Sequence, residues 1–288
     1  MRLTQARSLL FLPATSTRLL ARAAERGADA LIVDLEDSVP LDRKTLARSL
    51  VRRAVDGLAD RSPTLVRVNA EPEQLQADLA SLPLDRLAGI LLPKVESAEQ
   101  VRSLAAQLGK IRGERVAPLP IVALIESPLG VLRAEAIATA DPDVCALGFG
   151  AEDYAAALSV EPLPQAVSWA AQSVVNCARA FGLPCWGLPG SVAEIADMRA
   201  FGDLVIRARE IGFSGSVCIH PRQVPVVNAG FAPSEQQLAW ARRVVAAAEA
   251  ARAAGVDVVV VDGRMVDRPI VDRASRWIDS SPGRRAAD

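Results

Sequence analysis

The sequence of 288 residues is poor in aromatic side chains and in histidine. Phe, Trp and Tyr make up 4% of the chain, although half of its residues are hydrophobic. The core must therefore be built from Ala, Leu, Val and Ile, which favours layered α/β packing over an aromatic-rich β-sandwich. The single histidine, His220, excludes a histidine-rich metal site and leaves one candidate base for a Ser-His-Asp triad.

Paired cysteines, an excess of charge and long apolar runs are also missing. Cys145, Cys177, Cys185 and Cys218 form no CxxC pair, so we expect reduced and mostly buried thiols. The 33 basic and 34 acidic residues nearly cancel and provide no basic field for nucleic acid. No stretch approaches the ~20 apolar residues of a membrane span, and the N-terminus lacks the apolar segment of a secretory signal. We therefore expect a cytoplasmic protein with neither nucleic acid nor a membrane as partner.

Short aliphatic runs alternate with amphipathic stretches along most of the chain. The runs are nearly continuous rather than alternating, which is typical of parallel strands covered on both faces. The predicted strands are residues 8–13, 30–35, 64–68, 88–93, 120–125, 144–150, 183–187 and 216–220. The predicted helices include residues 16–26, 43–57, 98–111, 129–140, 165–181, 198–211 and 235–254. This order predicts an α/β fold, a (β/α)8 TIM barrel, and disfavours an open doubly wound sheet because no GxGxxG follows the first strand.

A further segment follows the last predicted strand and helix. Within it, Asp262-Gly263 is a hairpin turn signal. No low-complexity linker divides the chain. We predict a catalytic barrel over residues 1–255, a C-terminal arm over residues 256–280 and a disordered tail over residues 281–288.

Carboxylates gather where the predicted strands end, and in a barrel these positions line the active site. The polar residues there are Asp34, Glu36, Asp37, Arg67, Asn69, Lys94, Glu96, Glu126, Ser127, Glu152, Asp153 and His220. Clustered carboxylates with few histidines suit a hard cation, Mg²⁺ or Mn²⁺. Glu126 and Asp153 are the first choices as ligands because both follow very apolar strands. For Glu126 the alternative is an acid that caps the helix beginning near Pro128.

The basic residues in this set have two interpretations each. Arg67 can bind a substrate carboxylate with two N–H groups, or form a structural ion pair with the acids after the second strand. Lys94 could form a Schiff base, but the carboxylates around it should hold its pKa high, so we expect a salt bridge. His220 is expected to be a hydrogen-bonding residue at a strand end rather than a base.

Eight segments, in order along the chain, resemble one known family. They are RSLLFLP (7–13), GADALIVDLEDSV (27–39), LVRVN (65–69), ILLPKVES (90–97), ALIESPLGV (123–131), ALGFGAEDYAAAL (146–158), GFSGSVCIHPRQV (212–224) and VVDGRMVDRP (260–269). Together they resemble the citrate lyase β-subunit-like family of acyl-CoA lyases, which includes malyl-CoA, citramalyl-CoA and citryl-CoA lyases of the HpcH/HpaI aldolase superfamily.

The resemblance implies a Mg²⁺-dependent carbon–carbon lyase that acts on a 3-hydroxyacyl-CoA and yields a 2-oxo acid and acetyl- or propionyl-CoA. It implies that Glu126 and Asp153 hold the metal and that Arg67 binds the substrate carboxylate. It places Asp34, Glu36 and Asp37 close to the metal and its waters. It also implies that Asp267 in the arm reaches a neighbouring subunit's site, so that the protein is a homo-oligomer, a trimer or hexamer.

From these positions we predict two further sets of site residues. Glu36 and Asp37 act through metal-bound water or by orienting Arg67. The remaining substrate contacts are Asn69, Gly150, Ala151 and Glu152, and glycine allows a ligand to approach the backbone closely.

The sequence departs from the family pattern in three loops. Pro13-Ala14 replaces the usual Pro-Gly, residues 185–198 read CWGLPGSVAEIADM in place of a stretch with an acid, and Ser216-Val217 replaces a basic residue before CIHP. These loops leave the identity of the acyl-CoA open. The competing functions are a metal-dependent aldolase on free 2-oxo acids, a malyl-CoA-type thioesterase and a non-catalytic CoA-ester-binding subunit. The aldolase ranks lower because it usually needs a histidine near the metal.

Overall fold

The computed structural model of the chain describes residues 3–113, 118–253, 255 and 258–279. These residues divide into two compact units, one up to Phe231 and one from Ala232 onward. The predicted tail over residues 281–288 lies outside the described residues.

Eight parallel strands form one sheet in the first unit, in the order β7-β6-β5-β4-β3-β2-β1-β8. They are β1 (Ser8–Pro13), β2 (Ala30–Asp34), β3 (Thr64–Arg67), β4 (Gly89–Leu92), β5 (Ile121–Ile125), β6 (Val144–Phe149), β7 (Cys185–Gly187) and β8 (Ser216–Cys218). A parallel bridge between Trp186 and Gly215, together with the Gly187 N–H that donates to the Gly215 carbonyl at 3.0 Å, joins the two edges of the sheet. The predicted TIM barrel is confirmed, and the doubly wound alternative is wrong.

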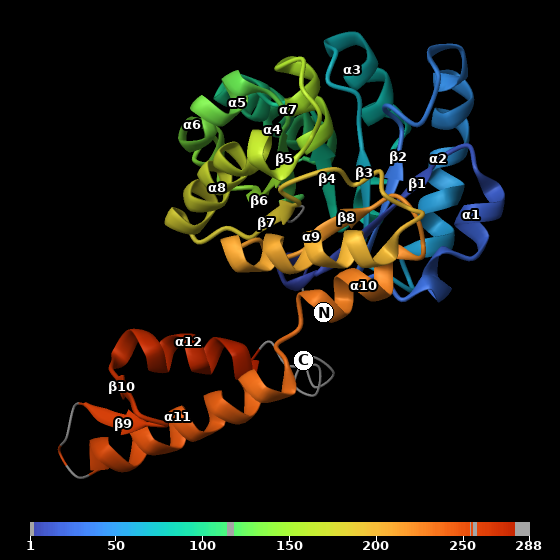
Figure 1. The fold of residues 1–288 in the computed structure, drawn as a ribbon. Helices are drawn as coiled ribbons and strands as arrows, with labels where there is room; N and C mark the ends of the chain where they lie inside the picture. Colours follow the sequence, from blue (N-terminus) through green and yellow to red (C-terminus); the bar gives the residue numbers. More distant parts are fainter. Residues whose placement is uncertain (1–2, 114–117, 254, 256–257, 280–288) are drawn as a thin grey trace. The chain divides into compact units, whose positions relative to one another are not determined.

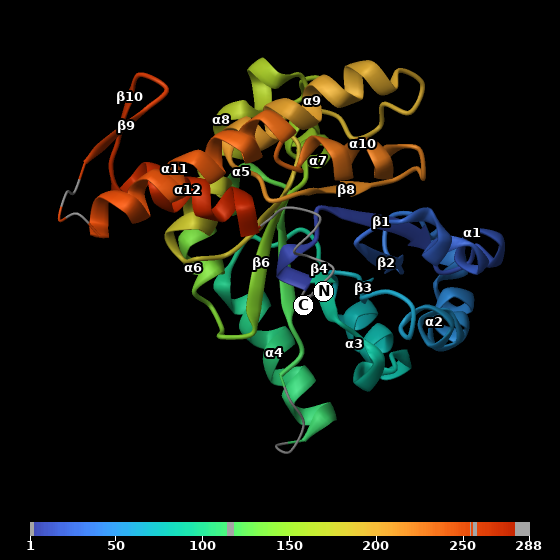
Figure 2. The same ribbon diagram turned by 90° about the horizontal axis from the view of Figure 1, so that it is seen from below.

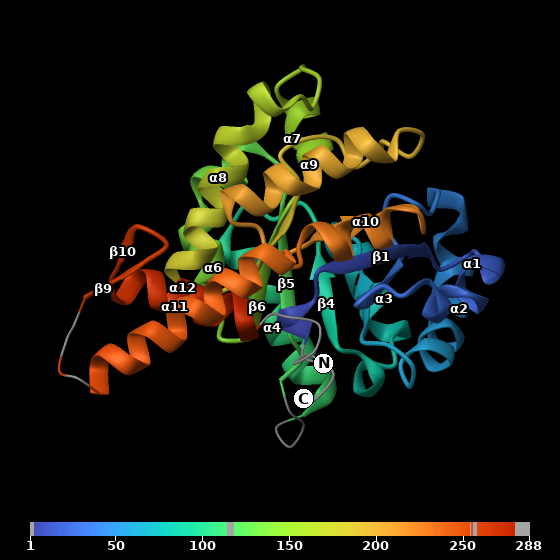
Figure 3. The same cartoon turned by 60° about the horizontal axis from the view of Figure 1, so that its bottom comes forward.

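Helices surround the strands on the outside of the barrel (Figures 1 and 3). They are α1 (Thr17–Ala21), α2 (Lys44–Leu58), α3 (Pro72–Ser81), α4 (Ala98–Arg112), α5 (Pro128–Leu132), α6 (Ala134–Ala138), α7 (Ala151–Ala157), α8 (Pro164–Ala180), α9 (Met198–Ile211) and α10 (Gln223–Gly230). Short 3₁₀ turns span Leu3–Gln5, Ala23–Arg26, Leu41–Arg43 and Leu84–Arg86. Two predicted helices are wrong as single helices. Residues 16–26 and 129–140 are each broken, because the backbone leaves helical angles at Arg22 (φ −114°) and Arg133 (φ −107°).

The strands are buried on both faces, which explains their continuous apolar sequences. One cluster fills the inside of the barrel and includes Leu9, Ile32, Leu65, Leu91, Val122 and Trp186. A second cluster, from the alternate strand residues, packs against the helices. Trp186 is 2% exposed, and its indole N–H donates to the Ala6 carbonyl at 2.9 Å.

The second unit is a helical hairpin with a small β-hairpin between its helices. It contains α11 (Glu235–Ala253), β9 (Val259–Val261), β10 (Arg264–Val266) and α12 (Arg268–Asp279), and the two helices lie side by side (Figure 2). The strands are antiparallel, and the turn between them has φ 51° at Asp262 and 73° at Gly263. The predicted hairpin turn is therefore confirmed. α11 packs against α12 within this unit. The division into a barrel over residues 1–255 and an arm over residues 256–280 stays a prediction.

Two expectations from composition can be compared with the structure. Within the described residues, no helix combines the length and the hydropathy that a membrane crossing requires. All four cysteines are free thiols, and Cys185 and Cys218 are buried.

We expect Trp186→Ala to lower the free energy of unfolding by about 3–5 kcal/mol, because it leaves a cavity inside the barrel and an unpaired Ala6 carbonyl. Trp169→Ala is the matched control, since Trp169 on α8 is 64% exposed, and it should cost less than about 1 kcal/mol. Urea denaturation followed by circular dichroism measures both. Equal losses would show that Trp186 is not part of the barrel core.

Candidate active site

A cavity of about 250 Å³ lies at the carboxyl ends of the barrel strands. Its polar lining includes Asp34, Arg67, Glu126, Glu152 and Asp153, which come from the ends of four different strands. The rest of its wall is mostly apolar and includes Phe11, Leu124, Phe149, Ala151, Leu188 and Val192. Most of the predicted site residues are therefore brought together by the barrel.

Arg67 is bound by Asp34, the last residue of β2. Nε donates to Oδ1 at 2.6 Å and Nη2 to Oδ2 at 2.7 Å, and the two residues are paired across the strands. Both side chains are largely buried. Burial alone would raise the pKa of Asp34, but the bonds and the charge of Arg67 outweigh it and hold that pKa below its usual value. The structural ion pair considered for Arg67 therefore exists, with Asp34 as its main partner.

Glu36 and Asp37 lie between two cations. Arg67 Nη1 is 3.0 Å from Glu36 Oε2 and 3.6 Å from Asp37 Oδ2. Lys94 Nζ is 2.5 Å from Glu36 Oε1 and 3.0 Å from Asp37 Oδ1. Burial lowers the pKa of Lys94, but these two carboxylates raise it above its ordinary value, so the side chain is an ammonium rather than a free amine. The expected salt bridge of Lys94 is confirmed.

Glu126 directly follows β5 and is nearly buried. The capping alternative is wrong, because α5 is capped by Ser127, whose hydroxyl accepts the Gly130 N–H at 3.1 Å. Instead, Glu126 Oε2 accepts the Lys94 backbone N–H at 3.0 Å. A Cβ on Gly150 would lie 2.6 Å from Glu126 Oε1, so a larger residue at position 150 would displace this carboxylate.

The carboxylates of Glu126 and Asp153 suit a divalent cation. Burial and the charge of Asp153 raise the pKa of Glu126 to about 8, and within the described residues Glu126 has no salt bridge to a basic side chain. Asp153 lies in the first turn of α7 and is exposed. In the part of the chain that the structure describes, no group of three or more His, Cys, Asp or Glu side chains is arranged to hold a metal. Two carboxylates fit Mg²⁺, which usually keeps waters and substrate oxygens as further ligands.

Other predicted site residues have different surroundings. Asn69 is buried outside the cavity lining, and its amide donates to the Leu35 carbonyl at 3.0 Å and to Asp78 at 2.7 Å. Glu152 lines the cavity and accepts a hydrogen bond from the Ser191 hydroxyl, in the loop after β7. Gly150 and Ala151 line the cavity beside it.

Asp267 and His220 do not line this cavity. Asp267 belongs to the second unit, where its carboxylate accepts the Ile270 N–H at 3.4 Å at the start of α12. His220 Nδ1 accepts the Arg222 N–H at 3.1 Å, which fits a hydrogen-bonding role at the strand end. A role of Asp267 in a neighbouring subunit stays a prediction.

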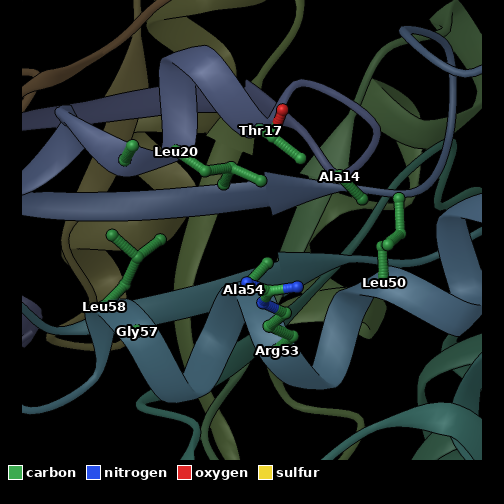
Figure 4. A pocket seen from close by; sticks show the side chains of 9 residues that line it. Ala14, Thr17, Leu20, Leu50, Arg53, Ala54, Gly57 and Leu58 are labelled. Carbon is green, nitrogen blue, oxygen red and sulfur yellow. The ribbon is translucent and has the colours of Figure 1, made fainter.

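A second hollow of about 340 Å³ lies between α1 and α2 (Figure 4). Side chains such as Leu20, Leu50 and Ala54 line it, and Arg53 is the charged residue among its lining. Because it brings together no set of reactive groups, we place the chemistry in the cavity that contains Arg67 and Glu126.

The fold and this cavity define an α/β-barrel protein whose strand ends present an arginine and a group of carboxylates. The chain belongs to the HpcH/HpaI aldolase/citrate lyase family, which its residues 7–221 match. The resemblance seen in the sequence is thereby confirmed.

Individual relatives match nearly the whole chain. The citrate lyase subunit beta of Escherichia coli (strain K12) is 35% identical over 275 residues, covering 93% of this chain and 90% of the relative. The (3S)-malyl-CoA thioesterase of Cereibacter sphaeroides (strain ATCC 17025) is 34% identical over 267 residues, covering 91% and 89%. The crystal structure of CitE from Mycobacterium tuberculosis, in complex with magnesium, acetoacetate and coenzyme A, has a TM-score of 0.76 at 32% identity and covers 97% of this chain and 99% of that one.

We expect Asp34→Asn to destabilise the protein by about 3 kcal/mol at neutral pH, because it leaves the buried guanidinium of Arg67 without its main anion. The pKa of Asp34 is lower in the folded than in the unfolded chain, so its stabilising effect is present above about pH 4 and is lost as the pH falls through the folded pKa. The difference between wild type and variant should therefore shrink below about pH 4.

Urea denaturation from neutral to acidic pH measures this difference. Asp42→Asn is the control, because Asp42 is exposed and its replacement should change stability by less than about 0.5 kcal/mol. A loss in Asp34→Asn that is independent of pH would contradict the ion pair as its cause.

Proposed function

We propose that the protein is a Mg²⁺-dependent acyl-CoA lyase that cleaves or forms a C–C bond in a 3-hydroxyacyl-CoA of the malyl-, citramalyl- or citryl-CoA type. The observation that carries the proposal is that one cavity contains both the buried carboxylate of Glu126, beside Asp153, and the guanidinium of Arg67. The relatives named as citrate lyase subunits and the structure that contains magnesium and coenzyme A support it.

Arg67 binds the carboxylate of the 2-oxo acid part of the substrate. A guanidinium has five N–H groups. Asp34 accepts one from Nε and one from Nη2, and Nη1 forms an ion pair with Glu36 Oε2 at 3.0 Å. These contacts leave at least one N–H on each terminal nitrogen, and a substrate carboxylate can accept one from each. The guanidinium also lies over the Phe11 ring at 4.6 Å, which helps to hold its plane.

Glu126 and Asp153 hold the metal. When bound, magnesium would supply positive charge for the carbonyl oxygen of the 2-oxo acid. The apolar wall of Leu124, Phe149 and Val192 excludes water and strengthens the electrostatic interactions inside the cavity. Because the charged Lys94 cannot form a Schiff base without losing its proton, we assign carbonyl activation to the metal rather than to an imine.

Proton transfer needs a group beyond the metal ligands. In the cleavage direction a base removes the proton of the substrate hydroxyl, and the enolate carbon of the acyl-CoA product gains a proton. We assign this proton transfer to the carboxylate of Asp267 from the arm of a second subunit. Glu36 and Asp37 act through water or by holding Arg67. The proposal therefore includes a homo-oligomer.

A malyl-CoA-type thioesterase is the second candidate, favoured by the relative that carries that name. The same cavity would then position a water molecule at the thioester carbonyl. The two activities differ in their products, since a thioesterase releases free CoA and leaves the hydroxy acid intact.

The direct test uses purified protein, Mg²⁺ and a panel of malyl-, citramalyl-, methylmalyl- and citryl-CoA. We expect equal amounts of a 2-oxo acid and acetyl- or propionyl-CoA, and no turnover in EDTA. Glu126→Gln and Asp153→Asn should each lower kcat/KM by at least about 100-fold, because each removes a metal ligand.

Glu99→Gln on the exposed side of α4 is the control for loss of a carboxylate. Full activity in EDTA would refute the metal. Free CoA with intact hydroxy acid would favour the thioesterase, and turnover of free 2-oxo acids alone would favour an aldolase.

The role of Asp267 across subunits can be tested by mixing two inactive variants. Arg67→Ala and Asp267→Asn should each be inactive, but subunits mixed by reversible dissociation should regain activity, because some sites then combine an intact Arg67 with an intact Asp267. A mixture of Arg67→Ala and Glu126→Gln should stay inactive, since both defects lie in the barrel. Wild-type rates for Asp267→Asn, or a first mixture without rescue, would refute the assignment.

A further inference from the structure

Lys94, whose backbone contacts the cavity residue Glu126, has an unusual conformation. It follows β4 with a φ of 52°, a left-handed angle that is unfavourable for a residue with a Cβ. In this conformation its N–H donates to Glu126 Oε2 at 3.0 Å. The strained backbone of Lys94 therefore orients the nearly buried carboxylate that we assign to the metal.

The side chain of the same residue contacts the other part of the site. Its ammonium is 2.5 Å from Glu36 Oε1, and Arg67 Nη1 is 3.0 Å from Glu36 Oε2. Each oxygen of Glu36 is thus bound by a different cation. Without the Lys94 ammonium, Arg67 is the basic side chain that remains in an ion pair with the Glu36 carboxylate. If both carboxylate oxygens then accepted N–H groups of Arg67, fewer would remain for a substrate carboxylate.

We propose that Lys94 is a positioning residue that acts on both parts of the site at once. Its backbone N–H orients Glu126 toward the metal, and its ammonium holds Glu36 so that Arg67 keeps two N–H groups for the substrate. This inference rests on the proposed function for the identity of metal and substrate. An ordinary salt bridge of a half-exposed lysine would contribute little and would affect neither ligand.

Four substitutions separate the effect of the Lys94 charge from the effect of its backbone conformation. Lys94→Met and Lys94→Gly both remove the ammonium. Both also allow the left-handed angle, which glycine adopts without an energetic cost. Lys94→Arg keeps the charge. Lys94→Val removes the charge and also disfavours the left-handed angle, because its side chain is β-branched.

Titration calorimetry with Mn²⁺, and with pyruvate in the presence of Mn²⁺, gives a readout that does not depend on turnover. We expect Lys94→Met and Lys94→Gly to bind pyruvate about tenfold more weakly, with Mn²⁺ affinity within about twofold of wild type. Lys94→Arg should restore pyruvate binding. Lys94→Val should also bind Mn²⁺ about tenfold more weakly, as expected when a group that orients a metal ligand is lost.

Steady-state kinetics should also show that loss of the charge affects mainly substrate binding. For Lys94→Met we expect a higher KM and a smaller change in kcat. A crystal structure of this variant should show both oxygens of Glu36 on Arg67. Lys110→Met, at an exposed position on α4, is the control for loss of a lysine and should match wild type. If Lys94→Val does not fold, the comparison of Lys94→Met, Lys94→Gly and Lys94→Arg still tests the role of the charge. The position of Glu36 in the structure of Lys94→Met then tests the mechanism.

The outcomes distinguish this inference from the proposed function. If no acyl-CoA is turned over but pyruvate binding still depends on the charge at position 94, the proposed function fails and the positioning role stands. Wild-type affinity for both probes in Lys94→Met, or an unmoved Glu36 in its structure, would overturn the positioning role. A wild-type protein that binds neither probe would overturn both.

Discussion

The buried ion pair between Arg67 and Asp34 is the interaction on which the mouth of the barrel depends. It joins the ends of β2 and β3 through two short hydrogen bonds, and the same carboxylate accepts the N–H groups of Glu36 and Ser38 in the following loop. Because two buried charges tolerate each other only in good geometry, the pair fixes both strand ends. It also determines which N–H groups of the guanidinium remain for a ligand.

The other charges of the site follow from this pair. Glu36 bridges from Arg67 to Lys94, and the Lys94 backbone reaches Glu126. Neighbouring cations thus stabilise the acids after β2, whereas Glu126 is left without a basic partner among the described residues and close to Asp153. A buried carboxylate in that position is costly as an anion, and a divalent cation relieves the cost. The anions after β2 are therefore part of the scaffold around the cation site that we propose.

The sequence predicted the strands well because a parallel strand buried on both faces leaves a strong local signal. It indicated that Arg67, Glu126 and Asp153 would line one cavity, because barrel topology places all strand ends together. The breaks at Arg22 and Arg133 left no such signal, since the hydrophobic periodicity continues across them. The sequence leaves open which acid at the end of the second strand pairs with Arg67. The register between β2 and β3, which places Asp34 opposite Arg67, decides it.

The sequence by itself determined the barrel, the hairpin turn at Asp262 and the collection of charged residues from which a site is built. These features depend on local periodicity and turn chemistry, which need no knowledge of distant contacts. Only the tertiary structure decided which partner each charge has. Ser127 rather than Glu126 caps α5, and Lys94 pairs with residues more than fifty positions away. Hydrogen bonds and ion pairs act over a few ångströms, and only the closed barrel brings those atoms within that range.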